Sequence, residues 1–187
     1  MPRLQTISDI ESLITDDHWM MTILRHVESL SLPDWYIGAG FVRNKIWDAL
    51  HGYASRTPLN DIDVVYFDPI NISEAHDHHL ERQLLTLDPT LPWSVKNQAR
   101  MHSRNGDAPY TDTVDAFSHW PETATCIGVR LINGHVEVKA PLGIEDLLAL
   151  RVRPNPHFLH KIDVYTKRVQ SKNWTILWPK LAIDIPS

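Results

Sequence analysis

Apolar residues recur at helical spacing in several segments of the chain. In the first, Ser8 and Glu11 form a capping-box pattern. Ile10, Leu13 and Ile14 supply a short apolar face, and together these residues predict a short helix. In the second, an aspartate at position 17 precedes the apolar positions and is the expected N-cap. Spacing and capping residues together predict further helices over residues 17–32, 41–51, 71–87, 113–119, 144–152 and 158–169. For the helix over 71–87 the expected caps are Asn71 and Glu74.

Alternating or β-prone segments lie between these helices and predict strands over residues 35–37, 61–67, 93–98, 125–132 and 135–139. Asn133-Gly134 favours a two-residue hairpin, which would place Arg130 opposite Glu137. The pattern predicts a single α+β (mixed α/β) domain over residues 1–187, with N-terminal helices in 1–33, a sheet core in 34–140 and C-terminal helices in 141–187.

Composition and charge narrow the class of protein. The chain is 43% hydrophobic and 22% charged, as in ordinary soluble domains, and 18 Lys and Arg against 23 Asp and Glu give a net charge of −5. This balance argues against a broad basic surface for nucleic acid. We expect a cytoplasmic protein. The chain has no apolar run of about 18 residues, the length needed to span a membrane, and acids at positions 9 and 11 come too early for a signal peptide. Its single cysteine, Cys126, excludes an internal disulfide.

A glycine-rich turn joins the first predicted strand to the helix over 41–51. Gly38, Ala39 and Gly40 form this turn, and Arg43 and Asn44 follow on the first helical turn. A turn of this kind lets a phosphate approach the backbone N–H groups at the positive end of a helix, and Arg43 adds a charge-assisted contact. The alternative is that the glycines only fit a tight turn.

Asp61 and Asp63 alternate with apolar residues in the second predicted strand. Side chains two residues apart share one face of a strand, so the two carboxylates lie side by side and repel each other. A cation relieves this repulsion, and Mg²⁺ takes carboxylate oxygens together with substrate phosphates. Two solvated aspartates on an exposed edge are the alternative, but the apolar run at 64–67 favours a strand that enters the core.

At these residues the sequence resembles a known family. The run from Tyr36 to Asn44, followed by Asp61-Ile62-Asp63, resembles the nucleotidyltransferase superfamily of DNA polymerase β. Its nearest well-known pattern is the Gly-Gly-x-Val-Arg-Asp and Asp-x-Asp head of tRNA CCA-adding enzymes and bacterial poly(A) polymerases, and the resemblance to a family of small bacterial proteins is closer still. The whole chain is also similar to small bacterial nucleotidyltransferase-like proteins, which share the segments 61–68, 97–102, 120–124 and 172–174. The resemblance implies a small mixed sheet flanked by helices, Mg²⁺ on the two aspartates and a nucleoside triphosphate at Ala39-Gly40.

The sequence departs from the family pattern at three places. Ala39 replaces the first glycine of the pair, and Asn44 replaces the acid after the arginine. Active members usually carry a third carboxylate on a neighbouring strand, where this chain has Lys96 or Asn97. Glu137 is one candidate for the missing acid, although an ordinary ion pair with the arginine across the hairpin is the simpler interpretation.

The leading hypothesis is a Mg²⁺-dependent nucleotidyltransferase that moves a nucleoside monophosphate from a triphosphate to an acceptor hydroxyl. Asp61 and Asp63 would hold one or two Mg²⁺ ions, the turn at 38–40 and Arg43 would bind the triphosphate, and Asn44 would orient the turn or contact phosphate. A small molecule or a protein is favoured over a long RNA as the acceptor. The choice of base and the oligomeric state stay open.

Two other classes of function remain. The absent third acid motivates a non-catalytic nucleotide-binding or regulatory module on the same fold. The weaker alternative is a histidine-dependent metallohydrolase, suggested by His76, His78 and His79. On a helix the first and third of these can meet while His78 points away, so a solvated helix face is favoured. The basic residues Lys167, Arg168 and Lys172 are likewise interpreted as a solvated helix face, with contact to the acceptor or to phosphate as the minor alternative.

Overall fold

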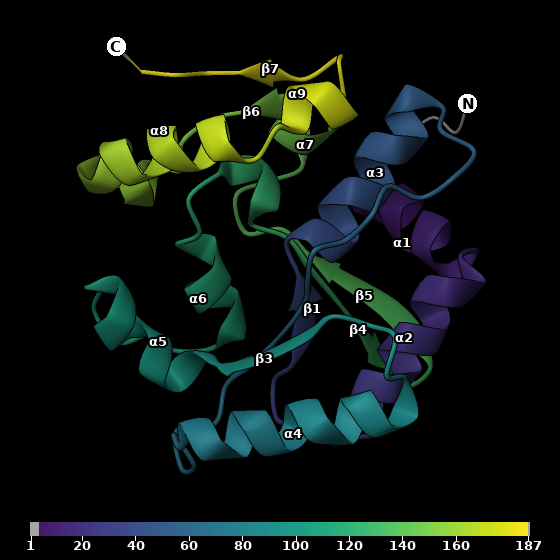
Figure 1. Ribbon diagram of the computed structural model, residues 1–187, viewed down its shortest axis with the longest axis vertical. Helices are drawn as coiled ribbons and strands as arrows, with labels where there is room; N and C mark the ends of the chain where they lie inside the picture. Colours follow the sequence, from purple (N-terminus) through teal and green to yellow (C-terminus); the bar gives the residue numbers. More distant parts are fainter. Residues whose placement is uncertain (1–3, 187) are drawn as a thin grey trace.

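A five-stranded mixed sheet forms the centre of the computed structural model, which describes residues 4–186 (Figure 1). The strands are β1 (Tyr36–Gly38), β2 (Ile62–Tyr66), β3 (Trp93–Asn97), β4 (Gly128–Ile132) and β5 (His135–Lys139). Their order is β3-β2-β1-β4-β5; β2 and β3 run parallel and the other pairs antiparallel. The expected α+β fold with a small mixed sheet is confirmed.

Helices surround this sheet on both faces. They are α1 (Ile7–Thr15), α2 (His18–Glu28), α3 (Gly40–His51), α4 (Glu74–Leu87), α5 (Gln98–Asn105), α6 (Thr113–Ser118), α7 (Glu145–Leu148), α8 (Ile162–Ser171) and α9 (Trp174–Leu177). Short 3-10 helices occupy Thr123–Thr125 and Pro156–Lys161, and β6 (Arg151–Val152) pairs in parallel with β7 (Ala182–Ile183). In Figure 1, α4 runs below the sheet, α1 and α2 lie to its right, α5 and α6 to its left, and α8 and α9 above. None of the helices described is long and apolar enough to cross a membrane.

The two faces of the sheet differ in what covers them. Ile62, Val64 and Tyr66 of β2 are fully buried in the main core, to which α1, α2 and α4 contribute. On the opposite face, Val65 packs with Tyr36 and with the ring of an α6 phenylalanine in a much smaller cluster. Alternation along β2 places Asp63 on this second, less covered face.

The hairpin has the predicted register. Arg130 pairs with Glu137, and Val129 pairs with Val138. The two turn residues, Asn133 and Gly134, both have positive φ, at 50° and 78°, as a type I′ turn requires. The strand before the turn is shorter than predicted, because residues 123–125 form a 3-10 helix.

The expected N-cap of the second helix is confirmed, since the Asp17 side chain accepts a hydrogen bond from the Met20 N–H. The first predicted capping box is wrong. Thr6 and Asp9 form the box of α1, while the Glu11 carboxylate accepts a hydrogen bond from the Val138 N–H of β5. Tertiary contact with the sheet edge therefore uses the acid that the sequence pattern assigned to the cap.

The predicted cap of α4 is also wrong, because this helix starts at Glu74. The Asp68 carboxylate accepts hydrogen bonds from the N–H groups of Ile70 and Asn71, so residues 68–71 form a turn. The Asn71 carbonyl oxygen accepts a hydrogen bond from the side chain of Asn97. Asn97 also caps α5, a helix that the sequence pattern did not predict.

The predicted helix over 144–152 is wrong in its second half. It ends at Leu148, and Leu150 adopts a φ of 55°, which no α-helix continues through. The chain then enters β6. The last predicted helix begins as a 3-10 helix at Pro156, and α8 proper starts at Ile162.

Candidate active site

The glycine turn lies at the end of β1, directly before α3. Ala39, between the two glycines, has φ 48° and ψ −117°, a conformation that glycine adopts far more readily than alanine. Gly38 is required for a different reason: a Cβ atom there would lie 2.4 Å from the ring of Trp120, which covers the Cα. The turn therefore combines a strained backbone at Ala39 with an indole ring packed against Gly38.

Asp63 lies beside this turn. The antiparallel register of β1 and β2 pairs Tyr36 with Val65 and Ile37 with Val64, and its continuation brings Gly38 opposite Asp63. Burial, reinforced by the charge of Asp61, raises the pKa of Asp63 to about 6, while Arg168 and other cations oppose this. Asp61 precedes β2 and is exposed, so only the second aspartate of the predicted pair lies within the strand, and the charge of Asp61 acts on Asp63 from outside it.

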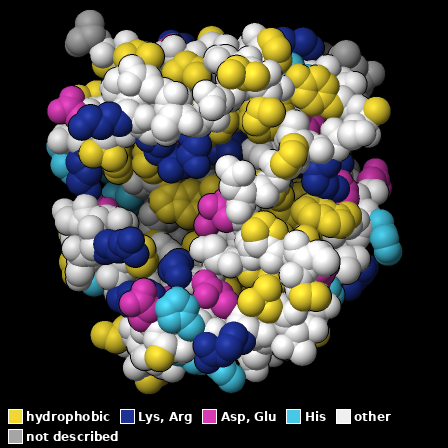
Figure 2. Space-filling model, in the orientation of Figure 1, with side chains coloured by type: hydrophobic (Ala, Val, Ile, Leu, Met, Phe, Trp, Pro, Cys, Tyr) yellow, Lys and Arg dark blue, Asp and Glu magenta, His cyan; other side chains and the backbone are white. Residues whose placement is uncertain are grey.

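A cavity of about 430 Å³ opens between α8 and the elements that carry Asp63. Ala39 and Asp63 lie on its wall together with Lys96, Trp120 and Arg168. Figure 2 shows the molecular face hollowed beneath α8, with basic side chains along its upper edge, a hydrophobic floor and acidic side chains beside it. The cavity is therefore lined by an anionic residue, Asp63, and by the cationic residues Lys96 and Arg168.

Arg43 lies below the turn and is only 6% exposed. Its guanidinium lies 4.6 Å from the ring centroid of Trp174 and 5.0 Å from that of Trp47. Both Nε and Nη2 donate to Oδ1 of Asn44, at 3.2 and 2.9 Å. Burial lowers the pKa of Arg43 to about 10, against the opposing charge of Glu122. The structure thus places Arg43 and Asn44 together as a buried pair.

Glu137 is not near this site. It lies on β5, and strands β1 and β4 separate it from β2. Its carboxylate accepts a hydrogen bond from Arg130 Nε at 2.8 Å and from the Tyr36 hydroxyl at 3.1 Å. The ion pair across the hairpin, which was the simpler interpretation, is what the structure shows.

Among residues 4–186, the strands next to β2 carry no carboxylate that could serve as the third acid of the site. On β3, Ser94 pairs with Asp63 and Lys96 pairs with Val65, so these two share the face of the aspartate. Asn97 points the opposite way, toward α4, where its N–H donates to Asp77. Within that described range no three acidic, histidine or cysteine residues form a group able to hold a metal ion.

The histidines of α4 behave as a helix surface. The rings of His76 and His79 stack at 6.4 Å between centroids, while His78 bonds to Glu81 at 3.0 Å. The first two meet and the third points elsewhere, as helical spacing predicts.

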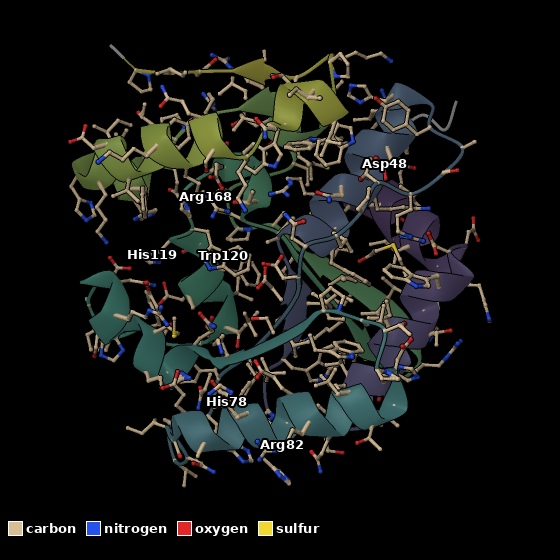
Figure 3. The ribbon with its side chains drawn as sticks, viewed as in Figure 1. Asp48, His78, Arg82, His119, Trp120 and Arg168 are labelled. Carbon is tan, nitrogen blue, oxygen red and sulfur yellow. The ribbon has the colours of Figure 1, made fainter. Side chains whose placement is uncertain are left out.

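Sequence reasoning missed the role of two charged residues here. Glu122 is fully buried and accepts a hydrogen bond from Arg168 Nε at 2.6 Å, so Arg168 is not part of a purely solvated helix face. In Figure 3, Arg168 points down from α8 toward the segment that carries His119 and Trp120. An acid within the otherwise apolar and hydroxyl-bearing run at 120–127 was the only local signal.

Comparison with known proteins shows the family of the chain. A family model described as a nucleotidyltransferase matches residues 25–183. The chain belongs to the nucleotidyltransferase family. An NMR structure described as revealing a CCA-adding enzyme head domain is 35% identical, with 99% of both chains covered and a TM-score of 0.87. No curated protein matches the chain in sequence.

Longer enzymes share the fold of this nucleotidyltransferase. A Thermotoga maritima CCA-adding enzyme complexed with tRNA is 14% identical, with a TM-score of 0.57 over 96% of this chain. A CCA-adding enzyme in complex with ATP is 16% identical, with a TM-score of 0.56 over 94% of this chain. The chain covers 42% of each of these two enzymes, so the likeness concerns their fold in that part alone.

Proposed function

We propose that this nucleotidyltransferase moves a nucleoside monophosphate from a nucleoside triphosphate to an acceptor hydroxyl in a Mg²⁺-dependent reaction. The observation that carries the proposal is the position of Asp63, which lines the cavity together with Ala39 of the glycine turn and is close enough to Asp61 for their charges to interact. A site for phosphates, a cation site and room for a second substrate are thereby adjacent.

The donor set fits Mg²⁺. Two carboxylates provide the hard oxygen ligands that this ion prefers, and burial together with the charge of Asp61 raises the pKa of Asp63, an effect that a bound cation would oppose. With only Asp61 and Asp63 as protein ligands, phosphate oxygens and water would complete the coordination shell. When bound, Mg²⁺ would neutralise phosphate charge and make the acceptor hydroxyl more acidic.

The other residues of the chain bind and orient. The N–H groups in the first turn of α3 would bind phosphate oxygens, because their partial positive charge favours an anion. In the reaction the acceptor oxygen bonds to the α-phosphorus, the bond to the β-phosphate breaks and pyrophosphate leaves with the electron pair. The hydroxyl proton passes to water. The size of the cavity and the net charge of −5 favour a small molecule or a protein as the acceptor over a long RNA.

Calorimetry with the four ribonucleoside triphosphates, in excess Mg²⁺ and in EDTA, tests the first half of this proposal. We expect Mg²⁺-dependent binding that Asp61→Asn and Asp63→Asn each weaken at least about tenfold, while Asp163→Asn on the exposed side of α8 leaves it unchanged. Equal affinities for all four proteins would show that the site is elsewhere. Triphosphate labelled at the α-phosphate, incubated with cell extract, then identifies the acceptor by its added mass.

One observation favours a second candidate, a nucleotide-binding module without catalysis. Lys96 occupies the face of β3 next to the aspartates, where a third carboxylate would otherwise assist catalysis. This candidate predicts that triphosphate binds and raises the melting temperature while no label reaches any acceptor. A single transfer product, lost in the Asp63→Asn variant, decides against it.

A further inference from the structure

Glu122 and Arg168 form an ion pair that has no role in the site of the glycine turn and the two aspartates as described above. Arg168 Nε donates to Glu122 Oε1 at 2.6 Å, and the hydroxyl of Thr125 donates to Oε2 at 2.9 Å. Glu122 has no exposed surface, whereas the Arg168 side chain keeps 35% of its own. A buried acid with both oxygens engaged therefore fixes one edge of an arginine that faces solvent.

The free edge of Arg168 faces the cavity of Asp63. Within the described part of the chain, Nε is the only atom of this guanidinium with a protein partner, so both terminal nitrogens are open to a ligand. Lys172 follows one helical turn later, and the charges of Arg168 and Lys172 both act on Asp63. Arg168 on the cavity wall and Lys172 just after α8 therefore both lie within electrostatic reach of Asp63.

Arg43, the arginine that the sequence pattern favours for phosphate, is differently placed. It is enclosed between two tryptophan rings and spends two of its nitrogens on Asn44. A guanidinium donates bidentately to phosphate only when two N–H groups are free on one edge. Both arginines keep the edge between their two terminal nitrogens, but Arg43 is only 6% exposed, whereas the Arg168 side chain is 35% exposed and lies on the wall of the cavity.

We propose that Arg168 binds the phosphate groups of the nucleoside triphosphate, and that Glu122 is a positioning residue that holds this arginine over Asp63. The inference deepens the proposed function and rests on it. It assigns to α8 a contact with substrate that the glycine turn and Arg43 do not supply.

The test uses inorganic tripolyphosphate with Mg²⁺ as the probe, because this ligand has the phosphates without base or sugar. We expect Arg168→Met to weaken its binding at least about tenfold, and Arg168→Lys to recover only part, since an ammonium is a point charge without the fork. Lys167→Met is the matched control: it removes a neighbouring cation from the exposed side of α8 and should change affinity less than about twofold.

A double-mutant cycle tests Glu122. Glu122→Gln keeps an oxygen for Nε but removes the charge, so we expect a smaller loss of affinity than for Arg168→Met. The double variant should bind no more weakly than Arg168→Met alone, because Glu122 acts through the arginine. Additive losses would show that Glu122 has an independent role. The double variant also leaves no unpaired buried carboxylate, and its melting curve verifies that it folds.

Two outcomes separate this inference from the proposed function. If Arg168→Met binds tripolyphosphate and nucleoside triphosphates like the wild type while Asp63→Asn does not, the inference is wrong and the proposed function stands. If the wild type binds neither ligand in Mg²⁺, both are wrong.

Discussion

The indole of Trp120 lies so close over Gly38 that a methyl group on that glycine would stand 2.4 Å from Cη2 of the ring. The contact joins the loop after α6 to the end of β1, 82 positions earlier by residue number (120 − 38). Gly38 is therefore fixed by a tertiary contact, whereas its neighbour Gly40 has no atom closer than 3.5 Å to the corresponding position.

Gly38→Ala should destabilise the protein by about 1–3 kcal/mol, because the ring or the strand must move to admit the methyl group. Urea denaturation measures the loss. Gly40→Ala is the matched control and should cost clearly less, since its methyl group meets only ordinary van der Waals contacts. Equal losses for the two variants would contradict the packing explanation.

Ala39→Gly should stabilise the protein by about 1 kcal/mol. The residue holds a positive φ of 48°, which costs an alanine more than the added flexibility of glycine costs the fold. The same substitution at Ala49, inside α3, should have the opposite sign and lose about 0.5–1 kcal/mol or more. Thermal denaturation of the two variants checks the contrast, and a loss at both positions would rule out strain at the turn.

Asp63→Asn should stabilise the metal-free protein at neutral pH. Because the pKa of Asp63 is raised to about 6 from the ordinary 3.8, the folded state holds the proton more tightly than the unfolded chain, and the wild type loses stability as the pH rises through this window. The difference corresponds to up to about 3 kcal/mol above pH 6 and to nothing below pH 4.

Melting temperatures in EDTA at pH 4 and pH 7.5 measure this effect. The variant should melt higher only at the upper pH, and added Mg²⁺ should raise the wild type but not the variant. A difference that is the same at both pH values would show that charge at Asp63 is not its origin.

Asp77→Ala should destabilise the protein by about 3–5 kcal/mol. This carboxylate has no exposed surface and accepts hydrogen bonds from the Tyr66 hydroxyl at 2.7 Å, the Asn97 N–H at 3.1 Å and the Arg100 guanidinium. Glu74→Ala on the same helix removes an acid that is 64% exposed and 3.9 Å from Arg100, and should change stability by less than about 0.5 kcal/mol. Chemical denaturation of both variants gives the comparison.

Local sequence signals were sufficient where the structure is locally determined. The turn at 38–40, the alternation around Asp63 and the hairpin at Asn133-Gly134 all depend on residues close together in the chain, and the structure has each of them. Strand order is different, because periodicity does not say which strands are neighbours. The distance of Glu137 from the aspartates follows from that order, although the cross-strand partner of this acid was already readable from the hairpin.

The pairing of Glu122 with Arg168 spans 46 residues and joins a 3-10 segment to a helix of another part of the chain. No local pattern contains such a contact, and a lone arginine on an amphipathic helix has the same sequence appearance whether it faces water or a buried acid. Helix α5 was not predicted, and the end of α7 was misplaced, for a related reason. Single side-chain caps and one residue of positive φ set these boundaries, and neither changes the apolar spacing.

The parallel pairing of β6 with β7 has a mechanical consequence for the cavity. The chain between the two strands, which carries Arg168, is anchored at both its ends, and the Tyr165 hydroxyl ties its middle to the carbonyl oxygens of Val152 and Asp184. The segment between β6 and β7, which includes α8 and lies next to the cavity of Asp63, is therefore held at both ends. Outward movement of this segment relative to β6 and β7 would have to break the Tyr165 hydrogen bonds or separate the short β6–β7 pair.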